Sequence, residues 1–421
     1  MAIDYEQRQL NHSSSLNRKR LETVVDAKVE APLGWDPYDY ELLRNPFGAF
    51  KRLRDEAPLY YNEEHDFYAM SRFEDCLEGL ADWETFSSAR GVITEMIKAG
   101  YPPPPGIFIS EDPPLHTVHR QILAKTFTAP RMAKLEQQIR DFCAHTLDPL
   151  AEAGSFDLIQ DFAGIVPMKV IGMLLGIPEE DQQAVRKRGD SRLRTEAGRP
   201  MEAVAQKTDT SFDDYINFRL ENPSEDLMSE LIYTEFEDDT GTRRRLTLDE
   251  VRNMTQMIAT AGNETTNKLI GWTGKLLSEH PDQRRDIREN RDLIFRAIEE
   301  VLRVEPPADH LGRYVTRDFE AYGKTVPAGS VMNFLTGAAN RDEREFADPE
   351  TFNIHRERRM HLTFGYGPHL CIGAALARIE GRIALDEMLN RFPDWEVDET
   401  NARMVPTTTV RGWETLPIIV H

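Results

Sequence analysis

Apolar residues recur at helical spacing over most of residues 115–305, and short runs rich in aromatic residues lie on either side of this region. Each of these runs predicts a short strand: Leu59–Tyr61, Asp66–Met70 and Ser330–Phe334. The pattern therefore predicts a chain that is mainly α with small β-sheets.

Two helices in this pattern have clear boundaries. The first opens with Thr247 and Glu250 at capping-box spacing and ends before Pro281, so it should hold about 32 residues and extend roughly 48 Å. The second follows Gly373 and runs through a stretch rich in Ala and Leu as far as Leu389. A helix as long as the first would cross most of a domain.

The composition limits the picture further. A chain of 421 residues could hold two or three domains, but no linker rich in Gly, Ser or Pro and no internal repeat is found. We therefore expect one large domain at 32–421, after a charged N-terminal segment at 1–31 for which flexibility is one interpretation. A net charge of −21 argues against nucleic acid as a partner. Without a signal peptide or a long apolar run, a cytoplasmic protein with no membrane anchor is favoured.

The three cysteines suit a reducing compartment, and Cys76 and Cys143 are expected to be structural. Cys371 differs because of the run Phe364-Gly-Tyr-Gly-Pro-His-Leu-Cys371-Ile-Gly373, whose three glycines permit a tight loop with amides near the sulfur. The helix that follows would place Cys371 at a helix N-terminus, which favours the metal-binding thiolate. The alternative is a small buried residue. The Phe-x-x-Gly-x-His-x-Cys-x-Gly frame makes chance a poor explanation.

This segment resembles the cysteine-ligand loop of the cytochrome P450 superfamily, the haem-thiolate monooxygenases. The resemblance covers roughly residues 35–421 and implies the P450 fold, with haem b (iron protoporphyrin IX) between a long distal helix and the cysteine loop. It implies that Cys371 binds the iron and that Phe364 and Gly373 adjoin the cofactor.

Ala261-Gly262-Asn263-Glu264-Thr265-Thr266 lies in the middle of the long predicted helix. A threonine hydroxyl there can bond back to a carbonyl one turn earlier, so we expect local distortion. The resemblance places this segment over the iron, with Gly262 beside the cofactor. It implies that Thr265 contacts the O₂ being activated and that Glu264 relays protons from solvent. Ordinary solvent-facing polarity is the alternative for Glu264.

The resemblance also assigns several basic and acidic residues. Glu300 and Arg303 share a helix face and would form a buried structural triad with Arg356, although a solvated surface pair is the alternative. Haem propionates need cationic or hydrogen-bonding partners. The implied partners are His116 and Arg120, which share a helix face that excludes His119, together with Arg313 and His369; each could instead be a surface residue.

Two segments, Thr85–Ser110 and Glu179–Asn222, resemble mobile covers over a pocket, with plain surface loops as the alternative. The implied substrate pocket is mostly apolar and comprises Ile93, Ile97, Phe108, Met257, Ile258, Ala261, Ala308, Leu311, Thr409 and Val410. It suits a terpenoid, steroid, fatty acid or aromatic compound. Asp309 or His310 could anchor a polar group, but surface exposure is the favoured interpretation for both.

Three functions remain open. The favoured one is an O₂-dependent monooxygenase that hydroxylates a hydrophobic small molecule. One oxygen atom would enter a C–H bond and the other would leave as water, with NAD(P)H electrons arriving through a ferredoxin or flavodoxin. The others are an H₂O₂-dependent peroxygenase, which tends to lack the acid and alcohol pair, and a non-catalytic haem-binding sensor. We expect a monomer that presents Arg358 and Arg359 to its acidic redox partner.

Overall fold

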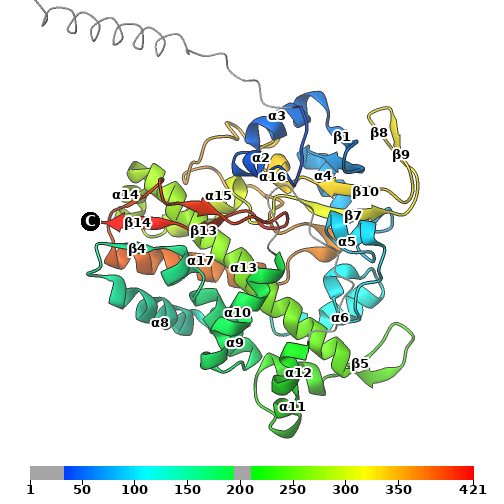
Figure 1. Ribbon diagram of the computed structural model, residues 1–421, viewed down its shortest axis with the longest axis horizontal. Coiled ribbons are helices and arrows are strands. Elements are labelled where there is room, and N and C mark those ends of the chain that lie inside the picture. Colours follow the sequence, from blue (N-terminus) through cyan, green and yellow to red (C-terminus); the bar gives the residue numbers. More distant parts are fainter. Residues whose placement is uncertain (1–32, 194–209) are drawn as a thin grey trace, which may run out of the picture.

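A single long helix forms the axis of the molecule. The computed structural model describes residues 33–193 and 210–421, and in it α13 (Leu248–Glu279) crosses the structure from one end toward the other (Figure 1). The Thr247 side chain accepts a hydrogen bond from the Glu250 N–H, and the Glu250 carboxylate accepts one from the Thr247 N–H, which completes the predicted capping box. The 32 residues of α13 confirm the predicted length.

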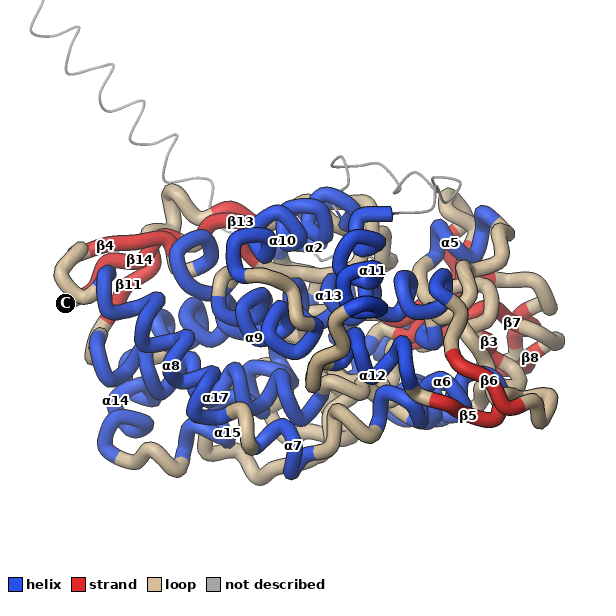
Figure 2. Tube along the Cα trace, turned by 90° about the horizontal axis from the view of Figure 1, so that it is seen from below, coloured by secondary structure: helices blue, strands red, loops and turns tan. Residues whose placement is uncertain are grey.

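Other helices pack around this axis. The helix α17 (Ala374–Arg391) contacts α13 on one side, and α9 (Val166–Leu175) and α10 (Glu179–Leu193) contact it on another. Figure 2 shows these helices gathered in one part of the molecule, with most strands at its two ends. The remaining described helices are α2 (Tyr40–Arg44), α3 (Phe47–Glu56), α4 (Phe73–Ala81), α5 (Thr94–Ala99), α6 (Leu115–Ala124), α7 (Ala129–Ala133), α8 (Glu136–Leu147), α11 (Asp213–Glu221), α12 (Leu227–Tyr233), α14 (Pro281–Glu289), α15 (Leu293–Val304) and α16 (Thr336–Ala339).

The largest sheet has the order β1-β2-β10-β7-β3 and lies beside the helical part (Figure 1). Its strands are β1 (Leu59–Asn62), β2 (Phe67–Met70), β10 (Val331–Phe334), β7 (Leu311–Val315) and β3 (Phe86–Ser87). The three runs of the chain that predict strands become β1, β2 and β10, which confirms them. β10 pairs in parallel with β2, with Met332 opposite Tyr68, and antiparallel with β7.

Smaller sheets complete the fold. β14 (Pro417–Val420) lies between β11 (Trp395–Val397) and β4 (Ser155–Asp157), so the C-terminal strand joins a segment from the helical region. The two-stranded sheets pair β12 (Arg403–Met404) with β13 (Trp413–Thr415), β5 (Glu235–Glu237) with β6 (Arg243–Arg245), and β8 (Phe319–Ala321) with β9 (Lys324–Val326). The mainly α fold class with small sheets is therefore confirmed.

Parts of the sequence predictions lie outside the described residues, namely the N-terminal segment 1–31 and positions 194–209 of the second predicted cover. Within 33–193 and 210–421, no single helix has the length and apolar character needed to cross a membrane. One bent pair, Ile159–Leu175 with Glu179–Ser191, passes that test of length and composition when taken together.

Candidate active site

The loop that carries Cys371 is held tightly against the rest of the fold. The Cys371 N–H donates to the Phe364 carbonyl at 2.8 Å, and a short 3₁₀ turn spans Gly367–His369. Gly367 has a φ of +70°, and a Cβ there would lie 2.8 Å from the carbonyl oxygen of Leu80 in α4. Only glycine satisfies both the left-handed backbone and this close approach.

The Cys371 sulfur lies at the start of α17, as predicted, and the backbone N–H groups of Gly373 and Ala374 stabilise its charged form. Desolvation of the sulfur by the surrounding protein outweighs these N–H groups and the nearby Arg120 and Arg378, so the pKa of the Cys371 thiol is raised overall although part of the residue is exposed. The expected contribution of the loop and helix amides is therefore present, but it is smaller than the opposing desolvation. A bound metal cation would supply the missing stabilisation, since coordination deprotonates a thiol.

Four basic side chains from three elements lie near this loop without an acidic partner among the described ion pairs: His116, Arg120, Arg313 and His369. Both ring nitrogens of His116 and Nε2 of His369 are buried and have no hydrogen-bond partner in the described part of the chain. The two rings lie 4.2 Å apart. Arg313 is buried, and its Nη1 donates to the carbonyl of the neighbouring Gly312.

The electrostatics of these groups favour an anionic ligand. Burial, followed by Arg120, His119 and Arg313, lowers the pKa of His116 to about 4, and burial lowers that of Arg313 to about 10. Buried cations and unpaired donors are costly unless an acceptor meets them. The cluster therefore suits a ligand with one or more carboxylates.

His119 belongs to a different site, as its place off the His116 and Arg120 face predicts. Its Nδ1 lies 2.8 Å from the Glu111 carboxylate and its Nε2 lies 3.6 Å from that of Glu250. Burial disfavours the charged ring, but the hydrogen bonds and charges of the two carboxylates outweigh it and raise the pKa of His119 to about 9. This contact fastens the end of the first predicted cover to the start of α13.

On the middle of α13, Thr265 Oγ1 donates to the Ala261 carbonyl at 2.8 Å, the back-bond expected from the sequence. The helix nevertheless continues unbroken through this bond. Ala261 itself is exposed although it lies at the centre of the helix, and Leu370 and Cys371 are also exposed. An apolar group would cover this surface favourably.

Glu264 is buried, so the solvent-facing alternative is wrong. Its carboxylate lies 3.5 Å from Lys268 Nζ and also faces Asp190 of α10. Burial opposes ionisation, but Asp190, Lys268 and Arg186 lower the pKa of Glu264 overall, while burial and Glu264 raise that of Asp190 to about 8. These opposite shifts favour the proton on Asp190 over Glu264. Sequence patterns do not reveal Asp190 because it lies on another helix.

Comparison with known proteins decides the family. Residues 187–420 match the family described as Cytochrome P450. Cytochrome P450 109 of Bacillus spizizenii is 31% identical over 385 residues, covering 89% of this chain and 91% of that relative. Cytochrome P450 130 of Mycobacterium tuberculosis is 33% identical over 375 residues, covering 85% of this chain and 90% of that relative. This protein belongs to the cytochrome P450 family.

Solved P450 structures agree with this assignment. CYP109E1 from Bacillus megaterium, in complex with testosterone, has a TM-score of 0.82 at 28% identity and covers 90% of this chain and 99% of its own. CYP109Q5 from Chondromyces apiculatus has a TM-score of 0.80 at 33% identity and covers 92% of this chain and 98% of its own. The protein is accordingly a monooxygenase, and its cofactor is haem held through a cysteine thiolate. The basic cluster, which has no acidic partner among the described ion pairs, and the exposed apolar surface around Cys371 fit a flat, largely apolar group that carries two carboxylates.

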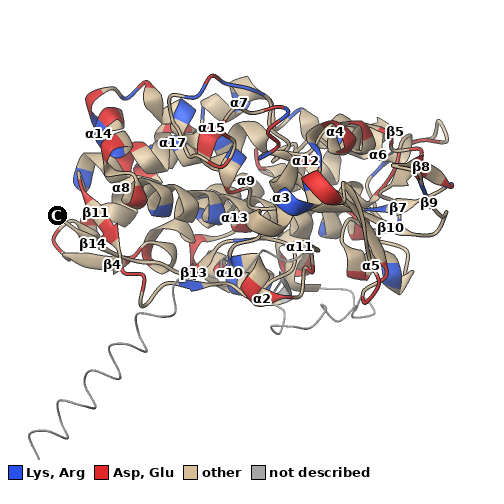
Figure 3. Ribbon diagram, turned by 90° about the horizontal axis from the view of Figure 1, so that it is seen from above, with Lys and Arg blue, Asp and Glu red and all other residues tan. Residues whose placement is uncertain are grey.

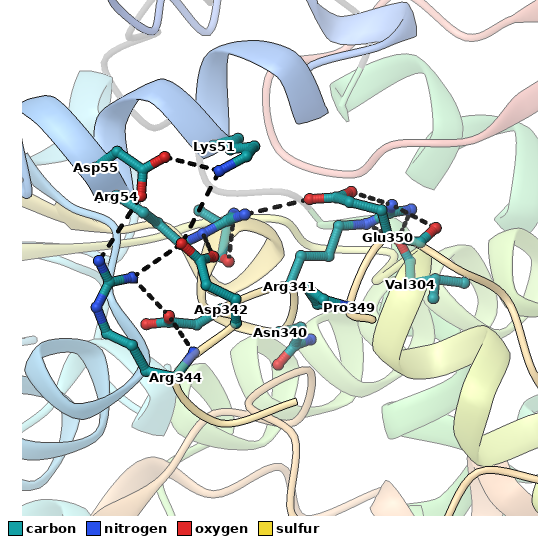
Figure 4. Close-up of polar contacts among 12 residues, drawn as sticks. Lys51, Arg54, Asp55, Val304, Asn340, Arg341, Asp342, Arg344, Pro349 and Glu350 are labelled. Carbon is teal, nitrogen blue, oxygen red and sulfur yellow. Dashed lines mark hydrogen bonds and ion pairs between the residues drawn. The ribbon is translucent and has the colours of Figure 1, made fainter. Parts of the chain in front are cut away.

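Three residues assigned to the P450 structural triad are in contact. The Glu300 carboxylate accepts hydrogen bonds from Arg303 at 2.7 Å and 2.8 Å and from Arg356 at 3.0 Å. Glu300 and Arg303 are buried, so the surface-pair alternative does not apply. A neighbouring network, in which Arg54 and Arg341 both bind Glu350, fastens α3 to the same region (Figure 4).

Gly262 has a packing role that sequence reasoning missed. A Cβ at this position would lie 2.5 Å from Cδ1 of Ile171, so the glycine lets α13 approach α9. This close packing accounts for a glycine here, and the expected contact of Gly262 with the haem stays a prediction.

The predicted P450 pocket residues, apart from the exposed Ala261, fall into three groups. Ile97 lies in a core cluster with Trp35, and Phe108 and Ile258 are buried in the main core; Ile93, Met257, Ala308 and Leu311 are half-buried. Thr409 and Val410 instead line a cavity together with Asp309. Asp309 and His310 are both buried, so the expectation of surface exposure is wrong. The two residues precede β7, where α3 and α16 cover them.

Proposed function

We propose that Cys371 is the iron ligand of this P450 and that His116, Arg120, Arg313 and His369 hold the haem propionates. The observation that carries the proposal is the position of the Cys371 sulfur, with the N–H groups of Gly373 and Ala374 directed to it and unpartnered buried donors beside it. Phe364 supports the loop, because its carbonyl accepts from Cys371 and its ring lies under Arg378. Haem supplies the chemistry that activates O₂, puts one oxygen atom into a C–H bond and releases the other as water.

Proton supply belongs to the acid and alcohol pair on α13. Thr265 offers a hydroxyl that can exchange its bond to Ala261 for one to a ligand, and the adjacent Glu264 faces Asp190, whose pKa is raised to about 8 by burial and by Glu264. Both residues are present, which favours an O₂-dependent reaction over a peroxygenase and over a non-catalytic haem protein.

The substrate is a hydrophobic small molecule of the terpenoid, steroid, fatty acid or aromatic type. Support comes from the apolar residues near the site and from the testosterone bound to CYP109E1. Electrons come from NAD(P)H through a ferredoxin or flavodoxin, and the enzyme works as a cytoplasmic monomer.

The test is the absorption spectrum of the reduced holoprotein with carbon monoxide. We expect the red-shifted Soret band of a thiolate-bound haem, and we expect Cys371→Ser to lose it. The cysteine Cys143, which is buried in the core away from this loop, provides the matched control Cys143→Ser. An unchanged spectrum in Cys371→Ser would show that another residue binds the iron.

A further inference from the structure

Glu299 is a buried acid to which the proposed function gives no role. It lies on α15 directly before Glu300 of the structural triad, and only 8% of the residue is exposed. Its carboxylate oxygens accept two hydrogen bonds from Arg378 of α17, one from Nε at 2.6 Å and one from Nη2 at 3.2 Å. A pair of parallel hydrogen bonds holds both side chains in one geometry, so α15 and α17 are joined at this point.

Arg378 brings this contact to the loop of the proposed iron ligand. Its Nη1 donates to the Ala374 carbonyl at 3.4 Å, and its guanidinium lies 4.4 Å from the centre of the Phe364 ring. The same two residues bond to the backbone of Cys371: the Phe364 carbonyl accepts from the cysteine N–H, and the Ala374 N–H donates to the cysteine carbonyl. The positive charge of Arg378 therefore lies against the frame of this loop, where it favours the charged form of the Cys371 sulfur.

Glu299 is the acid that balances this charge. Arg378 meets no other carboxylate among the described ion pairs. Two further cations approach Glu299 from the segment before the loop, since His361 Nε2 and Arg358 Nε each lie 3.7 Å from its Oε2. Burial disfavours the charged carboxylate, but the hydrogen bonds and charges of His361 and Arg378 outweigh it and lower the pKa of Glu299 to about 2. The residue is therefore ionised at neutral pH.

We propose that Glu299 is a positioning residue that lowers the reduction potential of the bound haem, because it offsets part of the Arg378 charge beside Cys371. This inference rests on the proposed role of Cys371 as the iron ligand and deepens it. A negative charge near the iron disfavours the addition of an electron, and a buried charge acts strongly because little water screens it. Glu299 and Arg378 should therefore shift the potential in opposite directions.

The test is a redox titration of the haem-loaded enzyme. Glu299→Gln keeps the size of the side chain and removes its charge, so the potential should become more positive. Arg378→Gln should make the potential more negative, whereas Arg378→Lys keeps the charge and should stay closer to the wild type. The double variant Glu299→Gln with Arg378→Gln loses both charges, and its potential should fall between those of the two single variants.

The opposite signs separate this role from a merely structural one. Breaking a buried ion pair destabilises the protein whichever partner is removed, so a loss of stability cannot tell the two roles apart. A damaged loop would move the potential of both single variants in the same direction. Shifts of the same sign in Glu299→Gln and Arg378→Gln, or an unchanged potential in Glu299→Gln, would overturn the proposal.

Glu136→Gln is the matched control. Glu136 lies 3.1 Å from Arg382, which follows Arg378 by one turn on α17, and the side chains of Glu136 and Arg382 are 48% and 34% exposed. Water and salt screen such a pair, so this variant should keep the wild-type potential. A shift in Glu136→Gln as large as that in Glu299→Gln would show an effect of net charge alone and would remove the specific role of Glu299.

The carbon monoxide spectrum separates this proposal from the function on which it rests. Glu299→Gln should keep the thiolate-type band. If the wild-type enzyme lacks that band, the assignment of Cys371 fails. If the band is present but the potentials of the wild type and Glu299→Gln coincide, only the role of Glu299 fails.

Discussion

At the scale of a residue, the Thr265 hydroxyl shows how a side chain can be held ready for a ligand. Its bond to the Ala261 carbonyl keeps it inside the helix, yet that carbonyl also accepts the ordinary helical N–H, so the hydroxyl can leave at little cost. Thr273 makes the same kind of bond to the Leu269 carbonyl at 2.7 Å in a buried part of α13. The two threonines therefore differ in surroundings and share their local bonding.

We expect Thr265→Ala to reduce product formed per NAD(P)H by about tenfold or more, because proton delivery is impaired and electrons are diverted into peroxide. Substrate binding should change little, since the hydroxyl bonds to its own helix. Product yield, NAD(P)H consumption and H₂O₂ release measured together would check this outcome. Thr273→Ala is the matched control. If both variants divert electrons into peroxide to a similar extent, Thr265 has no special role in proton delivery.

Sequence patterns predict the residues whose partners are close along the chain. Glu300 and Arg303 are three positions apart, and the loop around Cys371 is a continuous run, so both are recognisable without coordinates. The acid pair of Glu264 with Asp190 and the burial of Asp309 are not, because they arise where distant segments meet. The pKa of the Cys371 thiol shows the same limit, since the loop amides are visible in the sequence and the burial that opposes them is not.

At the scale of an element, three segments meet at His119: the end of the first cover at Glu111, α6, and the first turn of α13 at Glu250. Glu250 also binds Arg244 at 2.8 Å and caps its own helix. The first and last residues of the long helix were therefore predicted correctly. The spacing of its apolar residues could not show that its first turn also anchors the cover. Likewise, β4 could not be predicted within a region of helical pattern, because the strand that pairs with it, β14, comes from the end of the chain.

The His119 ion pairs predict a pH-dependent contribution to stability. The pKa of His119 rises from 6.5 to about 9 on folding, so the contribution is full below pH 6.5 and is lost as the pH rises through about 9. It is worth roughly 3 kcal/mol at low pH. Urea unfolding of the wild type and His119→Gln between pH 6 and pH 10 should show a difference that shrinks with rising pH.

A suitable control is His145→Gln. His145 is exposed on α8, and its Nδ1 lies 2.6 Å from the Asp141 carbonyl of the same helix. This variant should track the wild type across the same range. A constant energy difference between wild type and His119→Gln would contradict the charged state assigned to His119.

At the scale of the whole molecule, acidic and basic residues alternate along the helices in spite of the net charge of −21 (Figure 3). An acidic redox partner therefore needs a local basic site. Arg358 and Arg359 have side chains that are 63% and 53% exposed. Arg358 lies 3.7 Å from Glu299, which also binds Arg378 at 2.6 Å, and Arg378 in turn acts on the Cys371 sulfur.

We expect the double variant Arg358→Glu with Arg359→Glu to slow haem reduction by a ferredoxin by about tenfold or more at low salt, with a smaller effect at high salt. Stopped-flow reduction over a range of ionic strength would measure this. Arg243→Glu on β6 is the control, because its side chain is exposed and β6 pairs with β5, which lies away from α15, the helix that Arg358 contacts (Figure 1). Equal reduction rates for the double variant and the wild type would show that the redox partner does not dock at Arg358 and Arg359.

The parallel pairing of β10 with β2 joins segments about 260 residues apart, and this separation governs how the protein can be made. A ribosome adds roughly 5 to 20 residues per second, so β2 waits on the order of 15 to 50 s for the strand that will cover its edge. Throughout that interval, the hairpin of β1 and β2 offers unpaired backbone groups to other nascent chains. Successful production of the enzyme therefore depends on shielding this edge during translation.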